Sequence, residues 1–434
     1  MDNRSHNRQI LEKKNSSIPL KPYPYTIDPR VTNPLFFSKN SPLENRNDSS
    51  NSEKDEYILF DDKLGLARRL KYSYVIFIFS AKLIFGCICL VKKVLLEKFE
   101  GNPILKPRSG WEKEAVFNPA AFFFDGKVFL FYRANGDWSE AISRLGIAWS
   151  RDGYHFERFG EPIFEPKLDF EKWGIQDPRT TIIGDTLYMT YVGCPGRCDP
   201  PLSILEKMGL PREEFERIVA EKKGTIPRIG LASLKLEFLK EPTKIKNKFI
   251  RYGPITPPDV HQRDAALFSE KINGLYAMVH RPRNWVGPEY GTHAPSIWIG
   301  YSRDLINWGN HRIVMRPREN WESEKIGAGP PPIKTERGWL LIYHGVDDKH
   351  VYRAGAALLD LDDPLRVIGR LSYPILEPKE DYERIGVVPN VVFPEGAVVL
   401  NGELFVYYGA ADKYCCVATC DLEELLDALE ESGE

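Results

Sequence analysis

Residues 118–134 read NPAAFFFDGKVFLFYRA, and this pattern of a short strand, a tight turn and an aromatic-rich strand occurs five times along the chain. Each copy places two turn residues between apolar runs of strand length, which predicts a β-hairpin. The turns of the five copies are Asp125-Gly126, Gly184-Asp185, Asn273-Gly274, Arg337-Gly338 and Asn401-Gly402. Asp-Gly and Asn-Gly are strong hairpin signals, because both central residues of a type I′ turn have positive φ.

The spacing of the repeats predicts the fold. The turn glycines at 126, 184, 274, 338 and 402 are separated by 58, 90, 64 and 64 residues, and further strand-like runs lie between the copies. About four strands per unit at this period indicate the blades of a propeller, and five aligned turns favour it over a sandwich or barrel. We therefore expect an all-β, five-bladed β-propeller over residues 94–425, followed by an acidic tail at 426–434.

One connection is longer than the others. The spacing between the second and third turns exceeds 64 by 26 residues, and the excess coincides with residues 200–223, PPLSILEKMGLPREEFERIVAEKK. Apolar residues recur there at helical spacing, and Leu210-Pro211 followed by acidic residues is typical of a helix start. We expect a helical insertion here. Three roles stay open: a lid, a contact in a homo-oligomer, or a solvent-exposed segment with no role of its own.

The composition excludes several classes of protein. The 434 residues include 59 Lys and Arg against 61 Asp and Glu, so the chain lacks the basic character of a nucleic-acid-binding protein. A mean hydropathy of −0.36 excludes a polytopic membrane protein. Seven cysteines without a CxxC pair and eight histidines without an HExxH motif argue against a disulfide framework and a metal site. We expect a cytoplasmic protein with no metal or organic cofactor.

The first 93 residues differ from the rest. Residues 1–56 are polar, which predicts disorder. Residues 72–91, YSYVIFIFSAKLIFGCICLV, carry a single charge at Lys82, and their length equals that of one membrane span. Three interpretations stay open: a membrane anchor, a buried or interfacial segment, and upstream sequence joined by an incorrect gene model to a true start at Val94.

Polar residues stand at the start of every repeat. Because the innermost strands of a propeller begin around a central channel, side chains at these starts converge on one pocket. The residues are Asn118, Asp177 with Arg179, Arg263 with Asp264, residues 325–329, and Glu395 followed by Asp412. A purely structural propeller does not need such a ring of carboxylates and cations, whereas a sugar or anion site does.

Five motifs in this order resemble those of glycoside hydrolase family 130. They are GIQDPRTT (174–181), RDAALFSEKINGLYAMVHRP (263–282), KIGAGPPPIKTERGWLLIYHG (325–345), YRAGAALLDLDDP (352–364) and FPEGAVVLNGELFVYYGAAD (393–412). The resemblance covers about residues 95 to 425. It implies a five-bladed propeller and an inverting phosphorylase of β-mannosides, which uses inorganic phosphate as co-substrate and yields α-mannose 1-phosphate from manno-oligosaccharides.

The resemblance also implies residue roles. Asp177 matches the family's catalytic acid, which is thought to act through a substrate hydroxyl. Phosphorolysis needs one general acid and no enzymic base, because phosphate is itself the nucleophile. The family's phosphate-binding positions correspond to Arg263, Lys325 and His344, with Tyr352 and Arg353 expected to contribute. Its mannose-binding positions correspond to Asn118, Arg133 and Asp412.

Structural interpretations of these residues stay open beside the functional ones. Asp-Pro is a common turn opener, as at Asp177. Arg263 has acidic neighbours with which it could simply pair. Lys325 has the surroundings of a solvated loop lysine, and His344 follows an apolar strand as a core histidine would.

Two other functions also stay open. An inverting hydrolase needs a second carboxylate about 6.5–9.5 Å from the acid, for which Glu395, Asp264 and Asp412 are candidates. A non-catalytic carbohydrate-binding propeller would keep the aromatic residues and lose the acid. The filled basic positions favour the phosphorylase, and the motifs leave the mannoside linkage undetermined.

Overall fold

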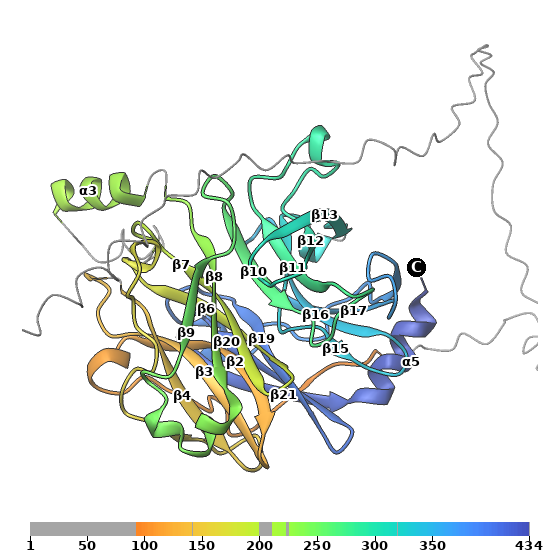
Figure 1. Cartoon of the computed structure of the whole chain (residues 1–434), viewed down its shortest axis with the longest axis horizontal. Helices are drawn as coiled ribbons and strands as arrows, with labels where there is room; N and C mark the ends of the chain where they lie inside the picture. The colour runs from red at the N-terminus through yellow and green to blue at the C-terminus, as the bar shows by residue number, and fades with distance from the viewer. Residues whose placement is uncertain (1–92, 141, 199–210, 223–224, 319, 434) are drawn as a thin grey trace, which may run out of the picture. The chain divides into compact units, whose positions relative to one another are not determined.

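The computed structural model describes residues 93–433 except 141, 199–210, 223–224 and 319, and it contains five antiparallel sheets that form the blades of a propeller (Figure 1). Each blade has four strands in order from the innermost strand outward, with a short extra strand in blade 4. Blade 1 has β2 (Ala115–Phe124), β3 (Lys127–Asn135), β4 (Arg144–Ser150) and β5 (Glu157–Arg158); blade 2 has β6 (Ile175–Ile183), β7 (Thr186–Gly193), β8 (Arg228–Lys235) and β9 (Ile250–Pro254); blade 3 has β10 (Gln262–Leu267), β11 (Tyr276–Pro282), β12 (Ile297–Ser302) and β13 (Trp308–Met315); blade 4 has β14 (Lys325–Ala328), β15 (Ile333–Lys334), β16 (Trp339–Val346), β17 (Tyr352–Leu359) and β18 (Val367–Arg370); blade 5 has β19 (Val392–Leu400), β20 (Glu403–Ala410), β21 (Tyr414–Asp421) and β1 (Glu97–Lys98). The predicted five-bladed propeller is confirmed.

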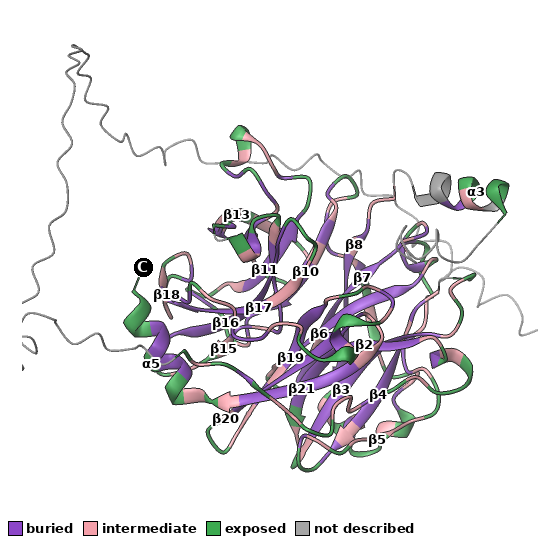
Figure 2. Cartoon of the chain, turned by 180° about the vertical axis from the view of Figure 1, so that it is seen from behind, coloured by how far each residue is buried: buried purple, intermediate pink, exposed green. Residues whose placement is uncertain are grey.

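The repeated hairpins are the two inner strands of each blade. The Asp125-Gly126, Asn273-Gly274 and Asn401-Gly402 pairs all have positive φ at both residues, as type I′ turns require. In the fourth copy, prolines 330–332 divide the inner strand into β14 and β15, because proline has no N–H to donate to the ladder. The inner strands are buried almost throughout (Figure 2).

Blade 5 is completed by the beginning of the described chain. β1 pairs with β21, with Glu97 opposite Thr419 and Lys98 opposite Ala418. The ring is therefore closed by strands more than 300 residues apart, and no signal in the sequence had identified β1 as the outermost strand of this blade.

A buried glutamate, a tyrosine and a cation recur in four of the five blades. The glutamate precedes the inner strand, the tyrosine on the second strand donates a hydrogen bond to it, and a cation from the outermost strand pairs with it. The sets are Glu112, Tyr132 and Arg158; Glu171, Tyr191 and Arg251; Glu322, Tyr343 and Arg370; and Glu383, Tyr408 and Lys98. Each set ties the inner edge of its blade to the outer edge by charge-assisted hydrogen bonds.

The tyrosine of blade 2 depends on a glycine in the third strand. A Cβ on Gly230 would lie 2.4 Å from the Tyr191 ring, so only glycine leaves space for that ring. Blade 3 departs from the pattern, because its second strand carries His280 in place of tyrosine. The His280 ring contacts Gln262 at 3.0 Å and His311 at 2.9 Å.

The helices lie outside the sheets. The expected helix in the insertion is present as α3 (Arg212–Lys222). Its role as a lid or as a subunit contact stays a prediction. Residues 426–434, expected as an acidic tail, mostly belong to helix α5 (Leu422–Ser432), whose Leu425, Leu426 and Leu429 are buried. The acidic residues of this segment made it look like a solvated tail. In the structure they face outward from α5, and Arg337 pairs with three of them.

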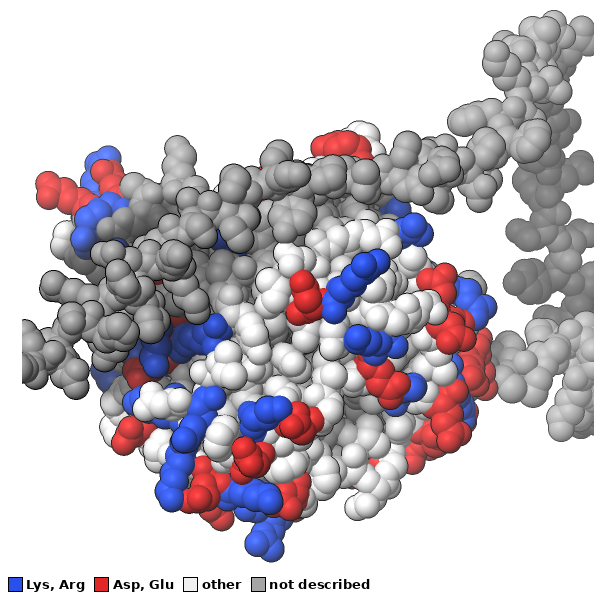
Figure 3. Space-filling model, viewed as in Figure 1, with Lys and Arg blue, Asp and Glu red and all other residues white. Residues whose placement is uncertain are grey.

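The proposals for residues 1–92, including the anchor at 72–91, lie outside the described residues. Within the described ranges, no helix is both long and apolar enough for a membrane crossing. Lys and Arg intermingle with Asp and Glu on the face drawn in Figure 3, as the near-zero net charge would suggest.

Candidate active site

Bulges at the starts of the inner strands create the site. The registers of β2, β6 and β10 shift where Asn118, Asp177 and Asp264 stand, and these three residues have φ of 49°, 52° and 54°. Asn and Asp adopt this left-handed conformation more readily than other non-glycine residues. A bulge redirects the side chain at its position, and all three side chains are buried.

Asp177 lies among donors from neighbouring blades. Its Oδ1 accepts hydrogen bonds from Asn118 Nδ2 at 2.8 Å and Arg133 Nη1 at 3.0 Å, and Arg263 Nη1 lies 3.5 Å from Oδ2. Burial by itself raises the pKa of Asp177, but Arg133, Arg263, Arg179 and the Asn118 hydrogen bond outweigh it. The pKa is therefore held below its usual value in the site without substrates.

A cluster of cations lies beside this acid. It consists of Arg263, Arg281, Arg283 and Lys325, which we call the cation cluster. Arg263 and Arg281 lie opposite each other in the register of β10 and β11, and the charges of the three arginines all lower the pKa of Lys325. Burial is the largest cause, and together these effects lower that pKa to about 7. Lys325 Nζ donates to the Tyr352 hydroxyl at 2.8 Å. Arg281 is buried, Arg263 and Lys325 are half-buried and Arg283 is exposed. An anionic ligand stabilises cations that lie close together in this way.

His344 connects the cation cluster to the carboxylates. Its Nε2 lies 3.0 Å from Arg281 Nη1, and Arg281 Nη2 lies 2.9 Å from Asp264 Oδ2. Burial, together with the charges of Arg281 and Lys325, lowers the pKa of His344 well below its usual value. His344 is thus neutral at physiological pH, and it accepts the hydrogen bond from Arg281.

The predicted site residues do not all meet. Tyr352 lies in the site, and its pKa is raised by burial and by nearby Asp412, which stands half-buried in the turn after β20. Arg353, the next residue of β17, points to the opposite face because strand side chains alternate. It pairs with Asp347 at 2.8 Å and with Glu377 at 3.6 Å. Its part in phosphate binding stays a prediction.

Sequence reasoning gave no role to Arg281 and Arg283. Both stand in the motif MVHRPR at the end of β11, where Arg281 lies opposite Arg263 in the strand register. Gln176 was also missed, and its Oε1 accepts a 2.6 Å hydrogen bond from Arg263. The alternation of side chains along a strand could have revealed Arg281 and Arg283. Two arginines that are two residues apart lie on the same face of an extended chain.

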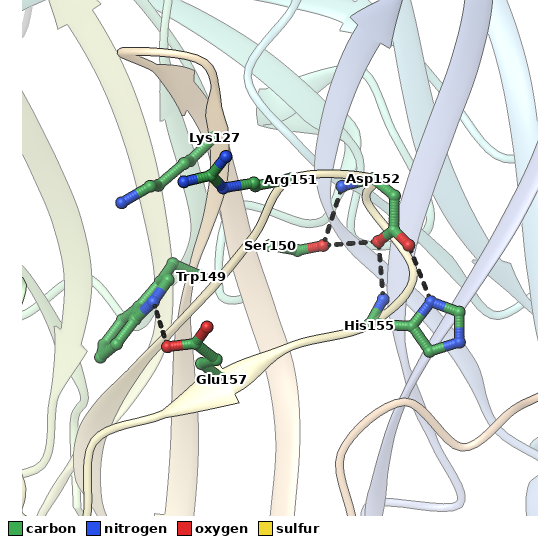
Figure 4. Close-up of a pocket in the computed structure, with 7 residues that line it drawn as sticks. All are labelled: Lys127, Trp149, Ser150, Arg151, Asp152, His155 and Glu157. Atoms are coloured by element: carbon green, nitrogen blue, oxygen red, sulfur yellow. Dashed lines mark hydrogen bonds and ion pairs between the residues drawn. The ribbon is translucent and has the colours of Figure 1, made fainter.

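A hollow of about 320 Å³ lies elsewhere, around the turn from β4 to β5 (Figure 4). Its polar groups bond to one another: Trp149 Nε1 donates to Glu157, and Asp152 accepts from Ser150 Oγ at 2.8 Å. The same serine–aspartate turn recurs in blade 3, where Ser302 Oγ donates to Asp304 at 3.0 Å. This hollow is therefore a feature of blade construction, and we assign it no function.

Comparison with known proteins agrees with this fold. The sequence profile of glycoside hydrolase family 130, described as beta-1,4-mannooligosaccharide phosphorylase, matches residues 95–198 and 241–431. The chain is therefore a member of glycoside hydrolase family 130.

Individual relatives give a finer picture. A 1,2-beta-oligomannan phosphorylase of Thermoanaerobacter sp. (strain X514) is 38% identical over 340 residues, covering 76% of this chain and 99% of its own. A beta-1,2-mannobiose phosphorylase of the same organism is 42% identical over 346 residues, covering 76% and 98%. The solved structure of the beta-1,2-mannobiose phosphorylase from Listeria innocua, in complex with beta-1,2-mannobiose, superposes with a TM-score of 0.61 at 28% identity, covering 77% and 99%.

Proposed function

We propose that this protein is an inverting β-mannoside phosphorylase that acts on β-1,2-linked manno-oligosaccharides. The observation that carries the proposal is the position of Asp177, a buried acid beside a cluster of four cations of which Arg263 lies 3.5 Å from its Oδ2. A phosphorolytic enzyme needs these two elements together: an acid for the departing sugar oxygen and a pocket that holds phosphate.

The geometry supports a simple reaction. A phosphate oxygen attacks C1 of the mannose from the face opposite the departing sugar, so the new bond has the α configuration. The C1–O bond to the departing sugar breaks, and that oxygen receives a proton originating from Asp177, directly or through a substrate hydroxyl. Arg263, Lys325 and Arg281 balance the charge of the phosphate.

Asp177 must carry a proton when it acts as an acid, although its pKa is lowered in the empty site. Bound phosphate would place negative charge beside Arg263, the same group that lowers this pKa. Its effect on the carboxyl would then be partly cancelled, and the pKa of Asp177 would rise as the substrates bind. Phosphate binding and acid protonation are thus coupled through one arginine.

The hydrolase alternative has less support. A catalytic base needs a carboxylate that can reach water, but the side chains of Asp264 and Glu395 are 1% and 0% exposed. Of the three candidates, only Asp412 is partly exposed. Both contact Arg179, and Asp264 also pairs with Arg281. A cation cluster prepared for phosphate would also have no purpose in hydrolysis.

The linkage rests on the relatives. The three proteins compared above are all named for β-1,2-linked mannosides, and two of them are at least 38% identical to this chain. The description of the family as a whole names β-1,4 linkages instead. We favour β-1,2, with chains longer than the dimer included, because one of these relatives is named for oligomannan.

The test is product analysis. Purified protein is incubated with β-1,2-mannobiose, β-1,2-mannotriose or β-1,4-mannobiose, with and without phosphate. Proton NMR then identifies free mannose and α-mannose 1-phosphate. We expect α-mannose 1-phosphate from the β-1,2 substrates only when phosphate is present. Free mannose formed at an equal rate without phosphate would make the protein a hydrolase, and preference for the β-1,4 dimer would overturn the linkage.

A further inference from the structure

Arg179 occupies the point where four blades meet. Its side chain is 1% exposed, and its three nitrogens contact five acceptors. The acceptors are Gly329 O at 2.9 Å, Asp177 O at 3.0 Å, Ala328 O and Glu395 Oε1 at 3.2 Å, and Asp264 Oδ1 at 3.4 Å. A guanidinium has five N–H donors, so these contacts use its full donor capacity.

The contact with Asp177 is made to its backbone. Asp177 has φ of 52°, a conformation that few non-glycine residues adopt without support from their surroundings. Arg179 Nη1 binds the carbonyl oxygen of this same residue. The guanidinium thus fixes the backbone turn from which the carboxyl reaches Asn118 and Arg133.

Acidic groups hold Arg179 in turn. The nitrogen that binds the Asp177 carbonyl also binds Glu395 Oε1. Burial raises the pKa of Glu395 well above its usual value although Arg179 opposes the shift. Asp264 contacts both Arg179, at 3.4 Å, and Arg281, at 2.9 Å.

We propose that Arg179 is a positioning residue for the reaction, which fixes the backbone of Asp177 and thereby aims the acid at the departing oxygen. The inference rests on the proposed function, because it assigns Asp177 as the acid. Arg179 itself contacts no substrate in this scheme, since its donors are directed to protein acceptors. Its loss should therefore lower kcat and leave substrate binding nearly unchanged.

The test compares Arg179→Lys with Arg370→Lys. Arg370 is a matched control because it is also buried, at 5% exposure, and donates to the Tyr343 hydroxyl of blade 4 and to the carbonyl of Arg316, which follows β13 of blade 3. For each variant, kcat, the KM of phosphate, the KM of the mannoside and Tm are measured. We expect Arg179→Lys to lower kcat at least about 100-fold, about 2.7 kcal/mol in activation free energy, with both KM values within about threefold. Arg370→Lys should lower Tm as much or more and keep kcat within about threefold.

Other results would overturn the inference. The inference fails if Arg179→Lys folds and keeps wild-type kcat, or if only its KM values change. It also fails if Arg370→Lys loses as much kcat as Arg179→Lys. If Arg179→Lys does not fold, Glu395→Gln and Glu395→Ala replace it. The glutamine keeps the acceptor for Nη1, so it should retain at least about tenfold more kcat than the alanine, and equal kcat would refute the role. A wild-type protein that forms no mannose 1-phosphate would instead overturn the proposed function.

Discussion

Substitution of Lys325 by arginine should remove the alkaline limb from the pH profile of phosphate use. Burial, with help from Arg281 and Arg283, lowers the pKa of Lys325 to about 7 in the free site. Only the ammonium form attracts phosphate, so affinity is greatest below this pKa and is lost as the pH rises through it. Arginine at the same position keeps its charge throughout, because its pKa exceeds about 12.

The expected magnitude follows from this titration. A group with a pKa of about 7 is about half charged at pH 7 and about one-tenth charged at pH 8. The kcat/KM for phosphate of the wild type, divided by that of Lys325→Arg, should therefore fall about fivefold between pH 7 and pH 8. Above pH 8 this quotient should fall about tenfold for each further pH unit.

The assay measures initial rates of mannose 1-phosphate formation at saturating mannoside, with phosphate varied at each pH. The quotient of the two proteins cancels the ionisation of phosphate itself, which is the same in both. A quotient that stays constant from about pH 6 to about pH 9 would show that Lys325 is not the titrating group. An alkaline limb of the same size in both proteins would come from a group other than Lys325, such as phosphate itself, and would leave the quotient constant.

Three further predictions concern the acid, the packing and the ring closure. Asp177→Asn should lower kcat about 10²- to 10⁴-fold while circular dichroism stays unchanged, because asparagine also tolerates the left-handed conformation; activity above a few per cent of wild type would contradict the assignment. Gly230→Ala should destabilise the fold by about 1–3 kcal/mol in urea unfolding, because the new Cβ meets the Tyr191 ring at 2.4 Å. The control Gly309→Ala has open space and should change stability by less than about 0.5 kcal/mol, so equal effects would refute the packing argument. A chain that starts at residue 100 should be less stable than one that starts at 94 by at least about 3 kcal/mol, since β1 and the Lys98 partner of buried Glu383 are lost; identical urea midpoints would show that β1 does not close the ring.

Some features of the site could be read from single motifs. Asn118 and Asp177 stand at the first positions of their repeats, and a propeller brings such positions together around its axis. The structure places both in contact, with Asn118 Nδ2 donating to Asp177. Lys325 and Tyr352 also meet, although no repeat position links them.

Other features depend on groups that are distant along the chain. The partner of Arg179 in blade 5, Glu395, is 216 residues away, and no local pattern states that the two touch. The same holds for Arg281, which stands in an ordinary strand sequence until folding brings it to His344. The shifted pKa values of His344 and Glu395 follow mainly from burial, which is a property of the folded chain alone.

The sequence by itself determined the number of blades and their hairpins, and its motifs predicted Asp177 as the acid. These features are local, because turn residues, strand alternation and short motifs act over a few residues. The tertiary structure alone decided that β1 closes the ring, that four cations form one cluster, and that Arg179 joins four blades at Asp177. Contact between distant segments and the loss of water around buried charges arise only when the ring closes, so they leave no signature in any single stretch of sequence.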